Sequence, residues 1–108
     1  MNSSALLLLT TLDADTDAST LARTLVEEGL AACVNVLPAM KSIYRWKGAV
    51  EEAREQQLLI KTSPAAIAAL KTRLLELHPY ETPELLVLDA DGSRDYLRWL
   101  DDATSPRR

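Results

Sequence analysis

The chain is poor in the residues that build several common kinds of active site. Its 108 residues include three glycines, one cysteine, one histidine and no phenylalanine. So few glycines exclude a glycine-rich phosphate-binding loop, and the nucleophile-elbow and paired-histidine zinc motifs are missing. We therefore do not expect an enzyme. A lone cysteine forms neither an internal disulfide nor a cysteine-based zinc finger, so we expect a reducing compartment, the cytoplasm.

Long apolar runs and an excess of positive charge are also lacking. The first apolar run, residues 5–9, is too short for a membrane span or a signal-peptide core. Twelve Lys and Arg against sixteen Asp and Glu give a net charge of -4, the wrong sign for binding phosphate backbones. We expect no membrane segment and no nucleic-acid partner.

What is present is an aliphatic set large enough for one core. Hydrophobic residues make up 47% of the chain. Residues 1–108 are therefore predicted to form a single domain, ordered roughly from residue 5 to residue 102 and followed by a short frayed tail.

Hydrophobic periodicity and turn residues predict four strands and three helices. The predicted strands are residues 5–12, 31–46 with a bend at Pro38, 50–62, and 85–88. The predicted helices start after Asp17, at Ser63-Pro64 and after Ser93; the first ends before Gly29, the second ends at Pro79, and the third packs Tyr96, Leu97 and Leu100 inward. With right-handed crossovers this order is an α+β, ferredoxin-like βαββαβ sandwich with an added C-terminal helix.

Local propensity conflicts with this prediction at residues 50–62. The run from Glu51 to Gln57 consists of residues that helices accept well. The Lys47-Gly48 turn and the matching length of the preceding strand favour a long β-hairpin, and we predict a strand.

The predicted hairpin is too long for a domain of this size. Fully extended, residues 31–46 reach about 50 Å, whereas a compact domain of this length is about 35 Å across. An overhanging hairpin leaves unpaired backbone groups, which a second copy of the chain would cover. Ile43, Tyr44 and Trp46 near its tip are candidate oligomer contacts, and the alternative is that they fold back on their own domain.

Several spaced motifs resemble one known family, the CutA divalent-cation-tolerance proteins. The resemblance covers Ala5 to about Asp101 and rests on Leu25-Val26-Glu27, Leu30-Ala31-Ala32-Cys33-Val34-Asn35, Ser42-Ile43-Tyr44-Arg45-Trp46-Lys47-Gly48, Lys61-Thr62, His78-Pro79-Tyr80-Glu81, Pro83-Glu84 and Tyr96-Leu97-Arg98-Trp99-Leu100. It implies a CutA-like ferredoxin-fold homotrimer, similar in architecture to the PII signalling proteins. It also implies a cytoplasmic role in the response to copper and other divalent metal ions.

The chain departs from the copper-binding pattern of this family. That pattern has a cysteine at the end of the first strand and two consecutive histidines before the Pro-Tyr step, where this sequence has Thr10, Leu77 and His78. We therefore expect metal, whether copper or another divalent ion, to be bound weakly or indirectly and not to be required for folding.

His78 is the only imidazole ligand that each chain offers, and Cys33, Glu81 and Glu84 are its candidate companions in a metal site. The preferred interpretation is that His78 caps a helix C-terminus, because one histidine cannot close a site. Cys33, between small apolar neighbours, is interpreted as a packing residue rather than a reactive thiol.

Tyr80 and Glu81 lie between Pro79 and Pro83 in a stiff corner, either a pocket wall or a plain connector. If it is a pocket wall, Trp46, Lys61 and Glu84 are candidate lining residues of an intersubunit cleft. Such a cleft supports an alternative function, a PII-like regulatory or scaffold module that binds a small anion or a partner protein. Hydrolysis of a small substrate at the Tyr80-Glu81 corner is the least favoured of the three functions considered.

The hairpin glutamates Glu51, Glu52 and Glu55 could bind cations. We interpret them instead as solvated strand charges that discourage unwanted edge pairing.

Overall fold

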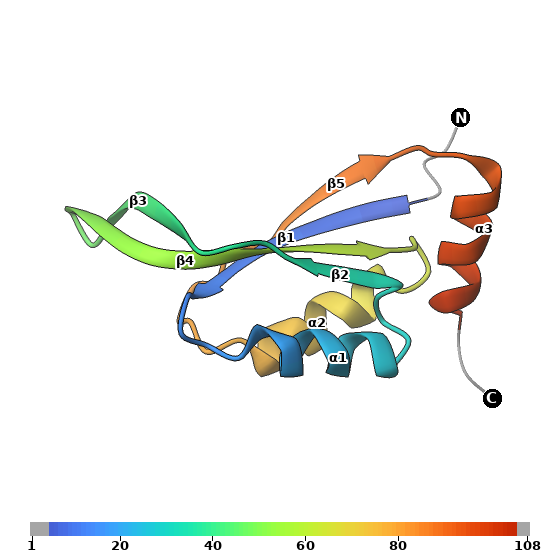
Figure 1. Cartoon of the computed structure of the whole chain (residues 1–108), viewed down its shortest axis with the longest axis horizontal. Coiled ribbons are helices and arrows are strands. Elements are labelled where there is room, and N and C mark those ends of the chain that lie inside the picture. Colours follow the sequence, from blue (N-terminus) through green and yellow to red (C-terminus); the bar gives the residue numbers. More distant parts are fainter. Residues whose placement is uncertain (1–4, 106–108) are drawn as a thin grey trace.

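The computed structural model describes residues 5–105 and contains five strands and three helices (Figure 1). The strands are β1 (Ala5–Asp13), β2 (Cys33–Val36), β3 (Met40–Trp46), β4 (Ala49–Thr62) and β5 (Leu86–Ala90). The helices are α1 (Ala18–Glu27), α2 (Ile67–Leu77) and α3 (Arg94–Ala103). The α+β architecture predicted from the sequence is confirmed.

All five strands belong to one antiparallel sheet. The order is β2-β4-β1-β5, and β3 pairs only with the far half of β4. The predicted strand 31–46 is thus divided into β2 and β3 by the segment that contains Pro38, because proline cannot donate a ladder hydrogen bond. Residues 49–62 form a strand as predicted, so pairing with three neighbours overrides their helix propensity.

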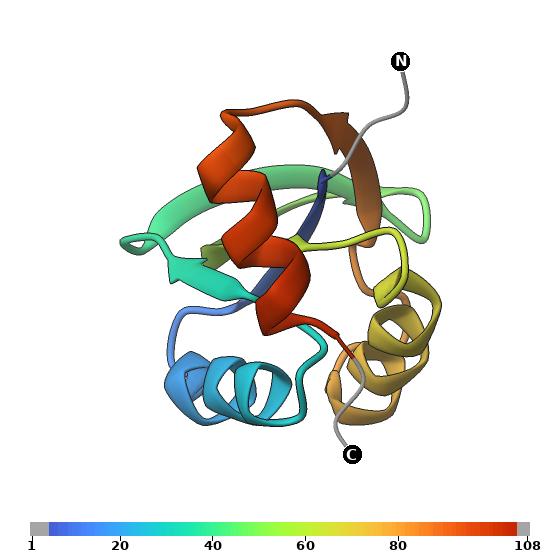
Figure 2. The same cartoon turned by 90° about the vertical axis from the view of Figure 1, so that its right-hand side faces the viewer.

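Helices α1 and α2 cover one face of the sheet, and α3 crosses its end (Figures 1 and 2). Between the sheet and α1 and α2 lies a core of fully buried aliphatic residues that includes Leu8, Leu25, Ile60, Leu70 and Leu74. A smaller cluster of Ala5, Ala32 and Leu100 anchors α3. None of the helices in residues 5–105 has the length and apolar content of a membrane span.

The helix ends test the predicted caps. The Asp17 carboxylate accepts a hydrogen bond from the Thr20 amide, and Ser93 accepts one from the Tyr96 amide. Gly29 adopts a φ of 73° and ends α1 as expected. The Ser63 cap is wrong: α2 begins at Ile67, and the Ser63 hydroxyl instead accepts a 2.6 Å hydrogen bond from Thr104.

Two predictions for the C-terminal region are also wrong. Tyr96 does not pack inward but is 43% exposed beside Trp99. Thr104, expected in a frayed tail, is buried, because its hydroxyl bonds to Ser63 and to the Leu100 carbonyl. The last three tail residues lie outside the described part of the chain.

The hairpin extends beyond the helices as an arm, residues 40–54, on the left of Figure 1. Lys47 and Gly48 both have positive φ, as a two-residue hairpin turn of the primed type requires. The molecule measures 44 × 29 × 23 Å and has a radius of gyration of 14.6 Å, larger than the roughly 13 Å of a compact domain of this length. The arm accounts for this excess.

Candidate functional site

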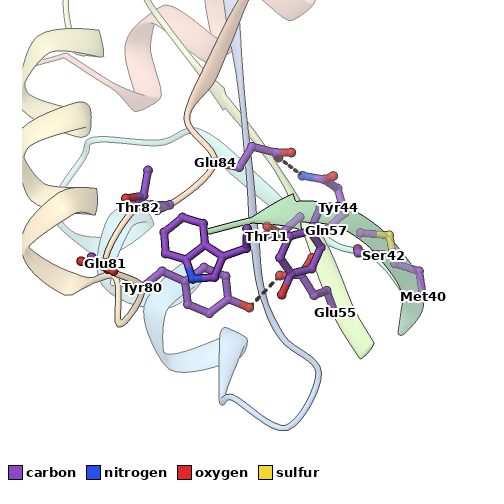
Figure 3. A pocket seen from close by; sticks show the side chains of 12 residues that line it. Thr11, Met40, Ser42, Tyr44, Glu55, Gln57, Tyr80, Glu81, Thr82 and Glu84 are labelled. Carbon is purple, nitrogen blue, oxygen red and sulfur yellow. Dashed lines mark hydrogen bonds between the residues drawn. The ribbon is translucent and has the colours of Figure 1, made fainter. Parts of the chain in front are cut away.

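A cleft of about 750 Å³ lies between the arm and the segment 80–84 (Figure 3). Its walls come from the arm, from β1 and β4 at the base of the arm, and from that segment. The lining residues are Thr11, Met40, Ser42, Tyr44, Trp46, Glu55, Gln57, Tyr80, Glu81, Thr82, Pro83 and Glu84.

Strand alternation explains how distant residues reach this cleft. Side chains two apart on a strand share a face, so Glu55 and Gln57 of β4 point the same way. Thr11 of β1 lies opposite Gln57 in the register, and Met40 of β3 lies opposite Glu55. Every second residue of β3 from Met40 to Trp46 lines the cleft.

Tyr80 closes the cleft over Glu55. Its hydroxyl donates a 2.7 Å hydrogen bond to Oε2 of Glu55, a carboxylate residue that is only 8% exposed. Burial of the phenol, reinforced by the Glu55 carboxylate, raises the pKa of Tyr80. Tyr80 therefore stays protonated and remains a donor to the carboxylate at neutral pH.

Gln57 fastens the segment before β5 to the sheet. Its Nε2 donates to the Thr10 carbonyl at 2.7 Å and to Oε2 of Glu84 at 2.9 Å. The amide group thus uses its donors on a backbone group and on a carboxylate, which fixes Glu84 on the cleft wall (Figure 3).

Both ring nitrogens of His78 are occupied by backbone groups. Nδ1 accepts a 3.1 Å hydrogen bond from the Tyr80 amide, which places the proton on Nε2, 2.9 Å from the Thr11 carbonyl that accepts it. Burial lowers the pKa of His78, although the Thr11 carbonyl opposes the shift. The ring is therefore a neutral connector between the end of α2, the segment after it and β1.

The four residues considered for a metal site are not brought together within one chain. Cys33 is the first residue of β2, is partly exposed, and pairs with Lys61. Glu81 forms an ion pair with Lys47 at 3.9 Å, and Glu84 is bonded to Gln57. Among residues 5–105, no three His, Cys, Asp or Glu side chains converge as metal ligands.

Two of the positions at which the resemblance implies copper ligands, Thr10 and His78, are also poorly suited to binding copper. The Thr10 hydroxyl, at the position where the resemblance implies a cysteine for copper binding, is fully buried and has no hydrogen-bond partner within the described residues. A hydroxyl is a much poorer ligand for copper than a thiolate. His78 is also bonded at both nitrogens, so neither position presents a free soft ligand within residues 5–105.

The predicted pocket residues separate into two groups. Tyr80, Trp46 and Glu84 line the same cleft, whereas Lys61 lies toward the other end of the sheet, opposite Leu7 and Cys33. Ile43, proposed as an oligomer contact, is 66% exposed on the arm, and Tyr44 and Trp46 are 43% and 39% exposed. Whether these residues contact another copy stays a prediction.

Sequence reasoning missed the centre of the cleft. Glu55 was interpreted as a solvated charge like Glu51 and Glu52, which are indeed exposed, but Glu55 is buried beneath Tyr80. Gln57 was considered only as part of a run with helix propensity and not as a site residue. The alternation of side chains along a strand could have indicated them, because it places Glu55 and Gln57 on the same face as Leu59.

A family model for the CutA1 divalent ion tolerance protein matches residues 6–103. The chain belongs to this family. The divalent-cation tolerance protein CutA of Thermus thermophilus is 50% identical over 97 residues, covering 89% of this chain and 94% of that protein. The Pectobacterium atrosepticum protein of the same name is 47% identical over 97 residues, covering 89% of this chain and 88% of that protein.

Solved structures of CutA proteins share the fold. The Thermus thermophilus structure superposes with a TM-score of 0.87 at 47% identity, covering 94% of this chain and 99% of that one. CutA from Synechococcus elongatus gives 0.89 at 41% identity, covering 96% and 93%. A CutA from Nostoc described as PII-like, in its apo form, gives 0.87 at 39% identity, covering 94% and 99%.

Proposed function

We propose that this CutA family member is a cytoplasmic, non-enzymatic homotrimer that takes part in the response to copper and other divalent metal ions and binds metal weakly or indirectly. Family membership supports the role in cation tolerance. The observation that carries the weak or indirect mode is His78, whose two ring nitrogens are both bonded to backbone groups.

Metal binding at His78 would have to break one of these two hydrogen bonds. Each buried hydrogen bond stabilises the fold by about 0.5–1.5 kcal/mol. Leaving its backbone group buried without a partner costs about 1–3 kcal/mol more. Without convergent Cys, Asp or Glu ligands in residues 5–105, a single imidazole does not repay this cost. Metal that does bind is expected on exposed carboxylates, with low affinity and without a defined geometry.

The trimer is supported by surfaces that a single chain leaves uncovered. Helices α1 and α2 protect only one face of the sheet (Figure 1). On the other face and on the arm, Leu86, Leu88 and Ile43 are 56%, 48% and 66% exposed. Patches of large apolar side chains of this kind are typical of interfaces between subunits.

Calorimetric titration with Cu²⁺ and Zn²⁺ tests the metal proposal. We expect a weak isotherm that is the same, within about twofold, for the parent and for His78→Gln. Cys33→Ser serves as the matched control for the other soft ligand. A tight, stoichiometric copper site that disappears in the His78 variant alone would overturn the proposal.

A second candidate function, a PII-like ligand-binding module, is favoured by the cleft. Its volume of about 750 Å³ suits a small molecule. The tyrosine bonded to a buried carboxylate gives the cleft a fixed polar feature. A thermal-shift screen in which no small molecule raises the melting temperature of the intact oligomer would remove this candidate.

A further inference from the structure

Glu55 is a nearly buried carboxylate without a counterion. Only 8% of the residue is exposed, and its one hydrogen-bond donor in residues 5–105 is the neutral Tyr80 hydroxyl. No Lys, Arg or His side chain in the described part of the chain lies within ion-pair distance of it. Burying a charge without a partner costs free energy, and the cleft beside it has room for one.

The cleft walls combine negative charge with aromatic faces. Three glutamates, Glu55, Glu81 and Glu84, line it, and no basic side chain of the described residues does. Tyr44, Trp46 and Tyr80 supply three aromatic rings. Negative charge repels an anion, whereas both carboxylates and aromatic faces attract a cation. The composition therefore does not favour the small anion, one of the two partners that the alternative function from the sequence allowed.

Two of the lining residues, Trp46 and Glu81, already lie beside an ammonium group of the chain itself. Nζ of Lys47 lies 5.6 Å from the centroid of the Trp46 ring and 3.9 Å from Oε2 of Glu81. The Lys47 ammonium thus lies near an aromatic ring and a carboxylate. The same two kinds of group lie together at Glu55 and Tyr80.

We propose that this cleft binds a small organic cation, an aliphatic amine whose ammonium group pairs with Glu55 and whose carbon chain lies against Tyr44, Trp46 and Tyr80. A bare divalent metal fits less well, because Glu84 is bonded to Gln57 and no three His, Cys, Asp or Glu side chains of residues 5–105 converge. This inference rests on the second candidate function, the ligand-binding module, and names the ligand class that the module takes.

Three probes of equal chain length separate charge from shape. Pentylamine, pentan-1-ol and hexanoate carry a positive, a neutral and a negative head group on the same five-carbon alkyl chain. Titrations use the intact oligomer of the Trp99→Phe variant, so that the fluorescence comes from Trp46 alone. We expect pentylamine to bind at least about tenfold more tightly than either of the other two probes.

The charge of Glu55 is tested by Glu55→Gln, with Glu52→Gln as the matched control. Glu52 lies on the same strand, is exposed, and does not line the cleft. We expect the first variant to lose pentylamine affinity by about tenfold or more and the control to keep it. Should Glu55→Gln fail to fold, Tyr44→Leu replaces it, because this variant keeps the Trp46 reporter and its loss of an aromatic ring from the cleft wall must weaken pentylamine binding.

The outcomes of these experiments distinguish failure of the organic-cation proposal from failure of the ligand-binding module on which it rests. If hexanoate or inorganic phosphate binds instead, or if Glu55→Gln binds pentylamine as well as the parent does, the organic-cation assignment is wrong and the ligand-binding module stands. If a broad thermal-shift screen finds no ligand of any charge, both the organic-cation assignment and the ligand-binding module are wrong. Binding of Mg²⁺ or Cu²⁺ that depends on Glu55 and excludes pentylamine would replace the amine by a metal.

Discussion

The two halves of β4 show how one strand can lie in two environments. From Glu55 to Thr62 it pairs with β1, and its residues Leu58 and Ile60 are fully buried under the helices. From Ala49 to Arg54 it pairs only with β3, and Val50 is 66% exposed. The body of the domain, residues 5–39 and 55–105, supplies its own core. Within the described residues the arm has a hydrogen-bonded ladder but no helix packed on it (Figure 1).

This difference shows that the arm is the part of the domain that lacks a core of its own. A two-stranded hairpin with exposed Ile43, Tyr44 and Val50 is marginal in water unless something packs on it. The cleft lies at the boundary, where the buried Glu55 ends the body and the arm begins. We therefore expect the body to set the stability of the fold and the exposed arm to supply the contacts between copies.

The largest effect is expected from a cavity in the body. Leu74→Ala removes a fully buried side chain from the core between the helices and the sheet, and it should lower the free energy of unfolding by about 2–5 kcal/mol. Urea denaturation measures the loss. An unfolding free energy within about 1 kcal/mol of the parent would show that the body is not the self-sufficient unit described.

Polar substitutions on the arm should act on assembly instead. Ile43→Ser with Val50→Ser removes two side chains that are each 66% exposed in one chain, so the isolated fold should change by no more than about 0.5 kcal/mol per site. If copies bury these residues, the pair should weaken assembly by about 1.5–3 kcal/mol per side chain. Sedimentation at several concentrations measures this, and an unchanged assembly would place the contacts elsewhere.

The smallest effect is a pH dependence at His78, where the body meets the cleft. Because burial lowers the folded-state pKa of His78, the unfolded chain binds more protons between that value and about 6.5. The histidine's contribution to stability is therefore complete above about pH 6.5 and is lost as the pH falls through the folded-state pKa.

His78→Gln should lack this dependence, because the chain has no other histidine. Denaturant midpoints from about pH 7 to about pH 5 compare the two proteins. The lowered pKa values of Asp17 and Glu28 place their titrations below this range. Parallel curves for parent and variant would contradict the buried, neutral histidine.

The sequence predicted the body better than the boundaries and the cleft. Periodicity placed β1, α1 and α2 because their apolar residues face one core. Ser63 failed as a cap because its hydroxyl is engaged by Thr104, a partner 41 residues away. Tyr96 failed because helical spacing marks an apolar face without showing that the chain itself covers it.

For the cleft, the sequence indicated Tyr80 and Trp46 but not Glu55, the carboxylate that accepts the Tyr80 hydrogen bond. The Pro79 to Pro83 segment is visible in the sequence as a stiff corner. Glu55 reads locally as one of several solvated glutamates, and only the fold brings the Tyr80 hydroxyl onto it from 25 residues away. Burial by a distant segment leaves no local pattern, which is why the central residue was missed.

The most direct test of the account is the mass of the native particle. Sedimentation equilibrium at micromolar concentration should give the mass of three chains for the parent and a smaller species for the Ile43→Ser, Val50→Ser variant. A stable, monodisperse single chain for the parent would contradict the claim that the exposed arm is completed by other copies.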